Sequence, residues 1–183
     1  VILFFSIATV YADTIRDPIL EAVIREALDK SSGLIHVKDL EGLTELNASE
    51  RGIADLTGLE YCTNLKVLGL YGNNIIDLSP LSYLVNLENM DLGLNEITKL
   101  SPLSQLVNLE VLGLHGNNIT DLSPLSQLVN LEELYLSGNE ITKLSPISQL
   151  VNLKELSLAE NEITYISPLS QLVNLEELYL SGN

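Results

Sequence analysis

Few residues of this chain are of the kind that performs catalysis or binds metal: one cysteine, Cys62, and two histidines, His36 and His115. A nucleophile needs a base beside it, and a zinc site needs about four converging ligands. The two histidines lie far apart in the sequence, and no Gly-rich phosphate loop, HExxH or GxSxG motif is present. We therefore expect no enzymatic activity, no cofactor and no metal in these residues.

Carboxylates are the abundant charged group. The 183 residues include 25 Asp and Glu against 9 Lys and Arg, which gives a net charge of −16. A surface this acidic repels phosphate, and nucleic-acid-binding domains cluster basic residues on one face. No DxDxDG-type loop indicates a calcium site. The charge excludes nucleic acid as a partner and favours a protein partner with basic character.

These side chains belong to a strict 22-residue repeat. The unit from Leu131 to Asn152 reads LEELYLSGNEITKLSPISQLVN, with apolar residues at offsets 0, 3, 5, 10, 13, 16 and 19 from its first leucine. Alternation at offsets 3 and 5 predicts a short strand, and the later steps of three predict a 3₁₀-type return. Stacked units share a continuous core and form a parallel sheet along one side. The units begin at Leu43, Leu65, Leu87, Leu109, Leu131, Leu153 and Leu175, so residues 43–183 hold six complete units and a seventh that stops at Asn183.

Three columns of the repeat have structural interpretations. Asparagine stands at offset 8 of every unit after the first, where an amide can hydrogen-bond the backbone of a tight bend. The first unit has Arg51 there, and we expect the residues before that unit to complete its bend. Cys62 occupies offset 19, a leucine position, and is interpreted as a core residue. At offset 12 the charge alternates in sign from Asp77 to Lys143, which predicts ion pairs between neighbouring units.

The unit resembles that of the internalin-type bacterial leucine-rich-repeat family, LxxLxLxxNxIxDLxPLxxLxxL, and residues 43–183 match it nearly throughout. The resemblance implies an α/β fold, a right-handed leucine-rich-repeat solenoid (a horseshoe) with a parallel sheet on its concave side and 3₁₀-type returns on its convex side. It also implies a secreted or surface-attached protein that binds other proteins through the concave side.

The predicted concave face carries the candidate binding residues. Its outward positions, offsets 2, 4 and 6, vary most between units, whereas the return SPLSQLVN is identical at 101–108, 123–130 and 167–174. Exposed tyrosine and histidine side chains are typical of interaction surfaces. Glutamates stack at offset 2 of the last three units without evident compensation, which indicates an acidic, tyrosine-bearing strip at 131–183 for a basic partner; duplication of a tolerated glutamate explains the same column. The candidate partner-binding residues are Tyr71, Asp91, His115, Glu133, Tyr135, Glu155, Ser157, Glu177 and Tyr179.

The N-terminal segment has two predicted parts. Residues 1–12, VILFFSIATVYA, are typical of a signal-peptide remnant cleaved after Ala12, and the run is shorter than the roughly 20 residues that span a bilayer. Residues 13–42 are expected to form the helical cap that this family places before its first repeat. A helix should begin at Asp17-Pro18 with an apolar stripe from Ile19 to Leu28. A short strand at Leu34–Val37 and a turn of helix at Lys38–Leu43 should follow.

These features favour a binding module of an exported or cell-surface protein that recognises a protein or glycan on its concave face and does not span a membrane within this chain. Two alternatives stay open. One is an intracellular scaffold, for which the N-terminus would be uncleaved. The other is the recognition arm of an enzyme whose catalytic domain lies beyond residue 183.

Overall fold

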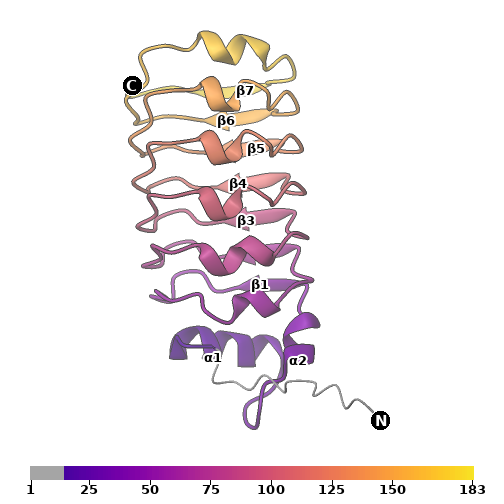
Figure 1. Ribbon diagram of the computed structural model, residues 1–183. Coiled ribbons are helices and arrows are strands. Elements are labelled where there is room, and N and C mark those ends of the chain that lie inside the picture. Colours follow the sequence, from indigo (N-terminus) through magenta and orange to yellow (C-terminus); the bar gives the residue numbers. More distant parts are fainter. Residues whose placement is uncertain (1–14) are drawn as a thin grey trace, which may run out of the picture.

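The computed structural model describes residues 15–183, and the predicted signal-peptide remnant at 1–12 lies outside them. One parallel sheet of seven strands runs in sequence order along one side of a stack of coils (Figure 1). Leu112 pairs with Leu134, 22 positions later, so the ladder and the sequence repeat share one register. The strands are β1 (Glu45–Asn47), β2 (Val67–Gly69), β3 (Asn89–Asp91), β4 (Val111–Gly113), β5 (Glu133–Tyr135), β6 (Glu155–Ser157) and β7 (Glu177–Tyr179).

Short 3₁₀ helices return the chain on the side opposite the sheet. A proline occupies one of the first two positions in every return after the first, where its missing N–H leaves no hydrogen bond unmade. The α/β solenoid with 3₁₀-type returns predicted from the repeat is therefore confirmed. The returns are η2 (Leu59–Tyr61), η3 (Ser79–Tyr83), η4 (Ser101–Leu103), η5 (Ser123–Leu125), η6 (Ser145–Ile147) and η7 (Ser167–Gln171).

The core is a set of stacked leucine and isoleucine columns. In the unit that begins at Leu131, all seven predicted apolar positions are at most 1% exposed. Cys62 is fully buried in its leucine column, as predicted. Burial, with a smaller effect of the Glu60 charge, raises the pKa of the Cys62 thiol to about 12. A thiol that stays protonated at neutral pH is a poor nucleophile.

Two helices cover the N-terminal end of the stack, α1 (Pro18–Ala27) and α2 (Val37–Glu41) (Figure 1). α1 begins after Asp17, as predicted, because the Asp17 carboxylate accepts hydrogen bonds from the first free N–H groups of the helix. Its buried face is narrower than the predicted stripe, since Ile19 is 40% exposed. Among residues 15–183, no helix has the length and apolar character needed to cross a membrane. The buried side chains of α1 are Leu20, Val23 and Ile24.

The prediction of a strand at Leu34–Val37 is wrong. Residues 34–36 form no strand, because the sheet begins only at β1 and offers them no partner, and Val37 is already helical. The His36 N–H instead donates to the Asp39 carboxylate at 2.8 Å, and α2 starts directly after it at Val37. The proposed division of the chain at residues 12 and 42 stays a prediction.

The asparagine at offset 8 joins each coil to the coil before it. The Asn117 side chain is only 6% exposed. Its Oδ1 accepts a hydrogen bond from the Ile97 N–H at 2.9 Å. Its Nδ2 donates to the carbonyls of Leu92 and Leu114, both at 3.0 Å. The column therefore satisfies buried backbone groups on two neighbouring coils.

The first coil has Arg51 at the asparagine position because an asparagine there bonds to the preceding coil, and no repeat coil precedes the first. Because an offset-8 amide serves the preceding coil, Asn73 completes the first bend, with bonds to the Ile53 N–H and the Ala48 carbonyl, both at 2.9 Å. The prediction that residues before the first unit complete this bend is right only in part, since Asp17 accepts hydrogen bonds from the Ala54 and Asp55 N–H groups just after the bend. Arg51 instead reaches α1, where its guanidinium lies 3.5 Å from the Glu26 carboxylate.

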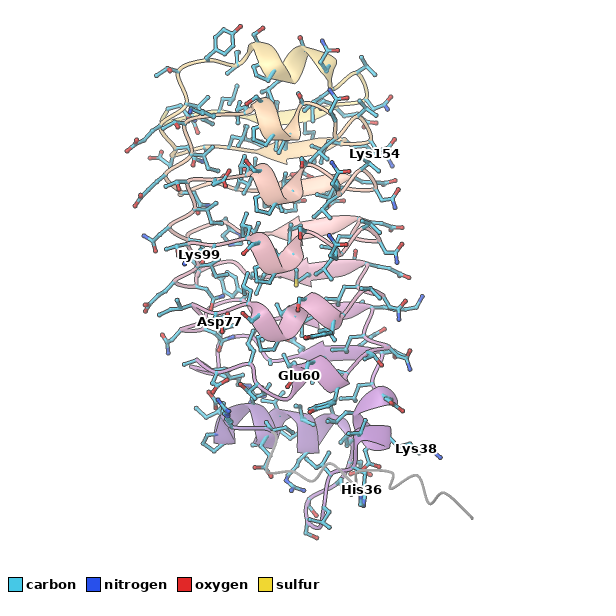
Figure 2. The ribbon with its side chains drawn as sticks, in the orientation of Figure 1. His36, Lys38, Glu60, Asp77, Lys99 and Lys154 are labelled. Atoms are coloured by element: carbon cyan, nitrogen blue, oxygen red, sulfur yellow. The ribbon has the colours of Figure 1, made fainter. Side chains whose placement is uncertain are left out.

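The charged column at offset 12 does not form the predicted ion pairs. Asp77 and Lys99 occupy adjacent coils (Figure 2), yet within residues 15–183 no ion pair joins members of this column. The Asp77 carboxylate instead bonds to the first residue of its own return. It accepts hydrogen bonds from the Ser79 hydroxyl at 2.6 Å and the Ser79 N–H at 2.9 Å, which lower its pKa. The ion pairs between neighbouring coils lie at offset 1: Lys66 with Glu88 (2.7 Å) and Lys154 with Glu132 (2.5 Å).

Candidate partner-binding surface

We call one surface the sheet face. It is formed by the outward side chains of the seven strands and by the residue two positions after each strand. Every residue predicted as a partner contact lies on it. Tyr71 and His115 follow β2 and β4, and Asp91 ends β3. The remaining six lie on the last three strands: Glu133 and Tyr135 on β5, Glu155 and Ser157 on β6, and Glu177 and Tyr179 on β7.

A glycine opens a hollow in the middle of this face. Gly113 of β4 pairs with Asp91 of β3 on one side and Tyr135 of β5 on the other. A Cβ atom at Gly113 would lie 2.6 Å from Asp91 Oδ1, so only glycine lets the carboxylate lean across β4. The resulting cavity has a volume of about 460 Å³, and we call it the sheet hollow. Its lining residues are Asp91, Val111, Gly113, His115, Tyr135, Ser137 and Ser157.

A second glycine brings two aromatic side chains together at the border of the hollow. A Cβ atom at Gly93 would lie 2.3 Å from Cε1 of His115, so the imidazole covers this glycine. The His115 ring reaches the Tyr71 ring across the intervening strand, with 5.6 Å between ring centroids and 35° between planes. Aromatic pairs at this separation attract each other, and the contact holds the His115 imidazole beside the hollow.

One tyrosine hydroxyl bridges two of the three stacked glutamates. Glu133 and Glu155 face each other on β5 and β6. The Tyr135 hydroxyl lies 2.8 Å from the Glu133 carboxylate and 3.0 Å from the Glu155 carboxylate, and it can donate its single proton to only one at a time. Partial burial, followed by these two hydrogen bonds, raises the pKa of Tyr135. These hydrogen bonds, which the sequence did not reveal, offset the repulsion between Glu133 and Glu155, and the Tyr179 hydroxyl donates to Glu177 alone.

The structure brings some of the predicted residues together and leaves others apart. Asp91, His115, Tyr135 and Ser157 line the sheet hollow. Tyr71, Glu133 and Glu155 border it through the contacts described above, whereas Glu177 and Tyr179 lie on β7, outside it. The sequence prediction missed Val111, Gly113 and Ser137. A glycine inside a strand signals a close approach and could have identified Gly113.

The sheet face offers carboxylates, hydroxyls and aromatic rings rather than a reactive centre. Over the described range 15–183, no three His, Cys, Asp or Glu side chains are grouped so that they could hold a metal ion. A stack of repeat coils with a varied, hollowed sheet face defines a solenoid-type binding scaffold.

Models of leucine-rich repeats match most of the chain. The model described as "Leucine Rich repeats (2 copies)" matches residues 41–83, 85–127 and 107–150, and "Leucine rich repeat" matches residues 130–183. The chain belongs to the leucine-rich-repeat family.

Solved structures of internalins share this fold. Internalin InlF of Listeria monocytogenes is 35% identical, with a TM-score of 0.78 over 94% of this chain, which spans 59% of the InlF chain. Internalin InlC2 of the same species is 30% identical, with a TM-score of 0.53 over 92% of this chain and 95% of its own. A leucine-rich-repeat protein of Leptospira interrogans is 34% identical, with a TM-score of 0.69 over 79% of this chain and 38% of its own. The internalin-type resemblance of the repeat unit is confirmed. Among curated proteins, no sequence matches the chain significantly.

Proposed function

We propose that this chain is a protein-binding module that recognises its partner on the sheet face, with a basic side chain of the partner seated in the sheet hollow. The observation that carries the proposal is the hollow itself, which combines a leaning carboxylate with apolar walls. A lysine or arginine could place its aliphatic stem against Val111 and the Tyr135 ring and its cation beside Asp91. No catalytic step is assigned to these residues.

The surroundings of the hollow support a basic partner segment. Glu133 and Glu155 lie directly beyond Tyr135, and the chain as a whole has a net charge of −16. A potential of this sign accelerates encounter with a basic segment and disfavours acidic ones. The rings of Tyr71 and His115 add rigid aromatic area, which contributes strongly at the centre of interfaces.

A peptide selection tests this proposal. Displayed random peptides selected on the 183-residue chain should be enriched in lysine and arginine, and Asp91→Asn should weaken their binding about tenfold, or about 1.4 kcal/mol. Calorimetric titration of synthetic peptides measures the change. Glu140→Gln is the matched control, because it removes the same charge from an exposed position outside the hollow. Equal losses in the two variants would leave only a general charge effect and contradict the proposal.

We also propose that the protein is exported, on the basis of the signal-like segment 1–12 and the internalin-type repeat. Protein isolated from its source cells should then begin at Asp13. Intact mass and terminal peptide mapping measure both ends at once. An uncleaved N-terminus would support the intracellular scaffold instead, and a catalytic domain beyond residue 183 would support the recognition arm of an enzyme.

A further inference from the structure

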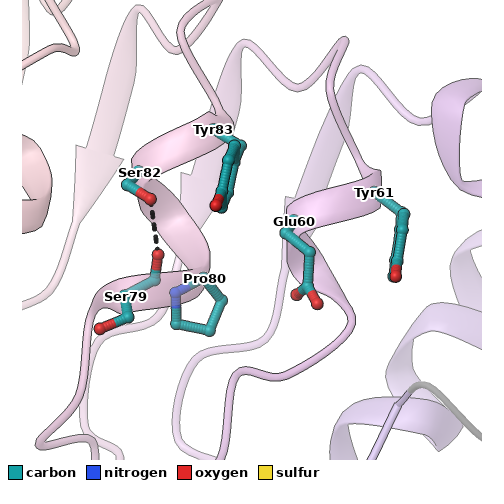
Figure 3. A pocket seen from close by; sticks show the side chains of 6 residues that line it. All are labelled: Glu60, Tyr61, Ser79, Pro80, Ser82 and Tyr83. Atoms are coloured by element: carbon teal, nitrogen blue, oxygen red, sulfur yellow. Dashed lines mark hydrogen bonds between the residues drawn. The ribbon is translucent and has the colours of Figure 1, made fainter.

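The first two returns of the solenoid differ from the later ones at one offset of the repeat. Tyr61 of η2 and Tyr83 of η3 stand at offset 18, and their side chains extend in the same direction from adjacent returns (Figure 3). With Glu60, Ser79, Pro80 and Ser82 they line a cleft of about 600 Å³, which we call the tyrosine cleft. The later returns carry glutamine at this offset: Gln105, Gln127, Gln149 and Gln171.

The two tyrosine side chains differ in how much of each is buried against the core. Tyr61 is half-buried and packs against core residues, whereas Tyr83 is 66% exposed. Figure 3 shows the Glu60 carboxylate between the two tyrosine side chains in this view. The carboxylate is held in place because it accepts a hydrogen bond from the Gly58 N–H at 2.6 Å. The cleft therefore combines two aromatic rings with one fixed negative charge.

The two serine hydroxyls of the cleft already have partners. The Ser79 hydroxyl donates to the Asp77 carboxylate at 2.6 Å, and the Ser82 hydroxyl donates to the Ser79 carbonyl at 2.8 Å. None of the six lining residues is basic, so none of them neutralises Glu60. A ligand in this cleft meets two tyrosine side chains, the Pro80 ring and the Glu60 carboxylate. This chemistry suits a cation that carries apolar groups and needs few hydrogen bonds.

We propose that the tyrosine cleft binds a quaternary ammonium group of the trimethylammonium type that choline carries. Such a cation is attracted to the faces of tyrosine rings and to a carboxylate, and it donates no N–H hydrogen bonds. The ammonium of lysine and the guanidinium of arginine bring three and five N–H donors that each need an acceptor, whereas a quaternary ammonium needs none. The cleft shares no residue with the sheet hollow, so the inference is independent of the proposed function.

Titration with choline chloride tests the proposal on the whole chain. Ring signals of Tyr61 and Tyr83, followed by NMR, should shift and saturate with a dissociation constant on the order of 1 mM, as expected for partly exposed rings. The uncharged carbon analogue 3,3-dimethylbutan-1-ol should cause no saturable shift. If the alcohol binds as well as choline, or if arginine amide binds more tightly, the proposal is overturned.

Glutamine variants localise the site. Tyr61→Gln and Tyr83→Gln install the residue that four other returns carry, so the fold should be kept, and each should weaken choline binding at least tenfold. Tyr165→Gln is the matched control, because Tyr165 is also 66% exposed but lies outside the cleft. Choline binding that persists in both cleft variants would overturn the proposal.

Flotation with phosphatidylcholine vesicles then distinguishes two sources of the group. Vesicle binding that Tyr83→Gln abolishes assigns the cleft to a lipid headgroup. Choline binding without vesicle binding assigns it to a soluble quaternary ammonium compound.

Discussion

Replacing Asn117 with alanine is expected to lower the free energy of unfolding by about 3–5 kcal/mol. The side chain is buried and makes four hydrogen bonds: it accepts one from the Ile97 N–H and donates to the carbonyls of Leu92, Leu114 and His115. Alanine makes none of them, and each buried group left without a partner costs about 1–3 kcal/mol. Equilibrium unfolding in urea, followed by circular dichroism, measures the loss.

The next residue provides the matched control. Asn118 is exposed, and its backbone N–H bond to the Ile97 carbonyl at 3.0 Å does not depend on its side chain. Asn118→Ala should therefore change stability by less than about 0.5 kcal/mol. Similar losses in the two variants would mean that the column does not stabilise the stack. Because Asn117 joins two coils, a lower denaturant slope in Asn117→Ala would further indicate that the coils unfold less cooperatively.

The fold could be predicted because the same spacing of apolar, asparagine and proline residues recurs from unit to unit. Strand, bend and return each follow from side-chain offsets, and the stacking follows because one coil cannot bury its own apolar face. The errors arose where a local hydrogen bond competes with a longer-range pair. Asp77 bonds to Ser79 two residues away rather than to Lys99 of the next coil, and Asp39 bonds the His36 N–H and favours a helix over a strand.

The sequence could predict which face of the sheet carries the candidate site, but not which residues of that face come together. Alternation shows which side chains point outward, but it does not show which of them lean over a neighbouring strand. Asp91 leans over Gly113 and His115 over Gly93, and these contacts depend on rotamers and on glycines in the adjacent coil. The hydrogen bonds from the Tyr135 hydroxyl to Glu133 and Glu155 likewise become apparent only from the distances between their oxygen atoms.

Asp17 joins the N-terminal helix to the first coil, and its replacement should have the second largest effect on stability. Its Oδ1 caps α1 by accepting from the N–H groups of Ile19 (2.8 Å) and Leu20 (3.3 Å). Its Oδ2 accepts from those of Ala54 (3.0 Å) and Asp55 (3.4 Å) in the first coil. Asp17→Ala removes both sets and should cost about 2 kcal/mol in urea unfolding. Asp17→Ser keeps a capping oxygen and should recover about half of that loss.

The difference in stability between wild type and Asp17→Ser should depend on pH. Partial burial by itself would raise the pKa of Asp17, but the four backbone N–H donors outweigh it and hold the pKa below its usual value of 3.8. A carboxylate whose pKa is lower in the folded state contributes stability above its unfolded pKa and loses it as pH falls through the folded pKa. The wild-type advantage should thus be constant from pH 7 to about 5 and shrink below about pH 4. Other carboxylates are common to both proteins and cancel in the difference. An advantage that persists unchanged to pH 2 would show that the contribution of Asp17 does not depend on its ionised carboxylate, and it would contradict this account.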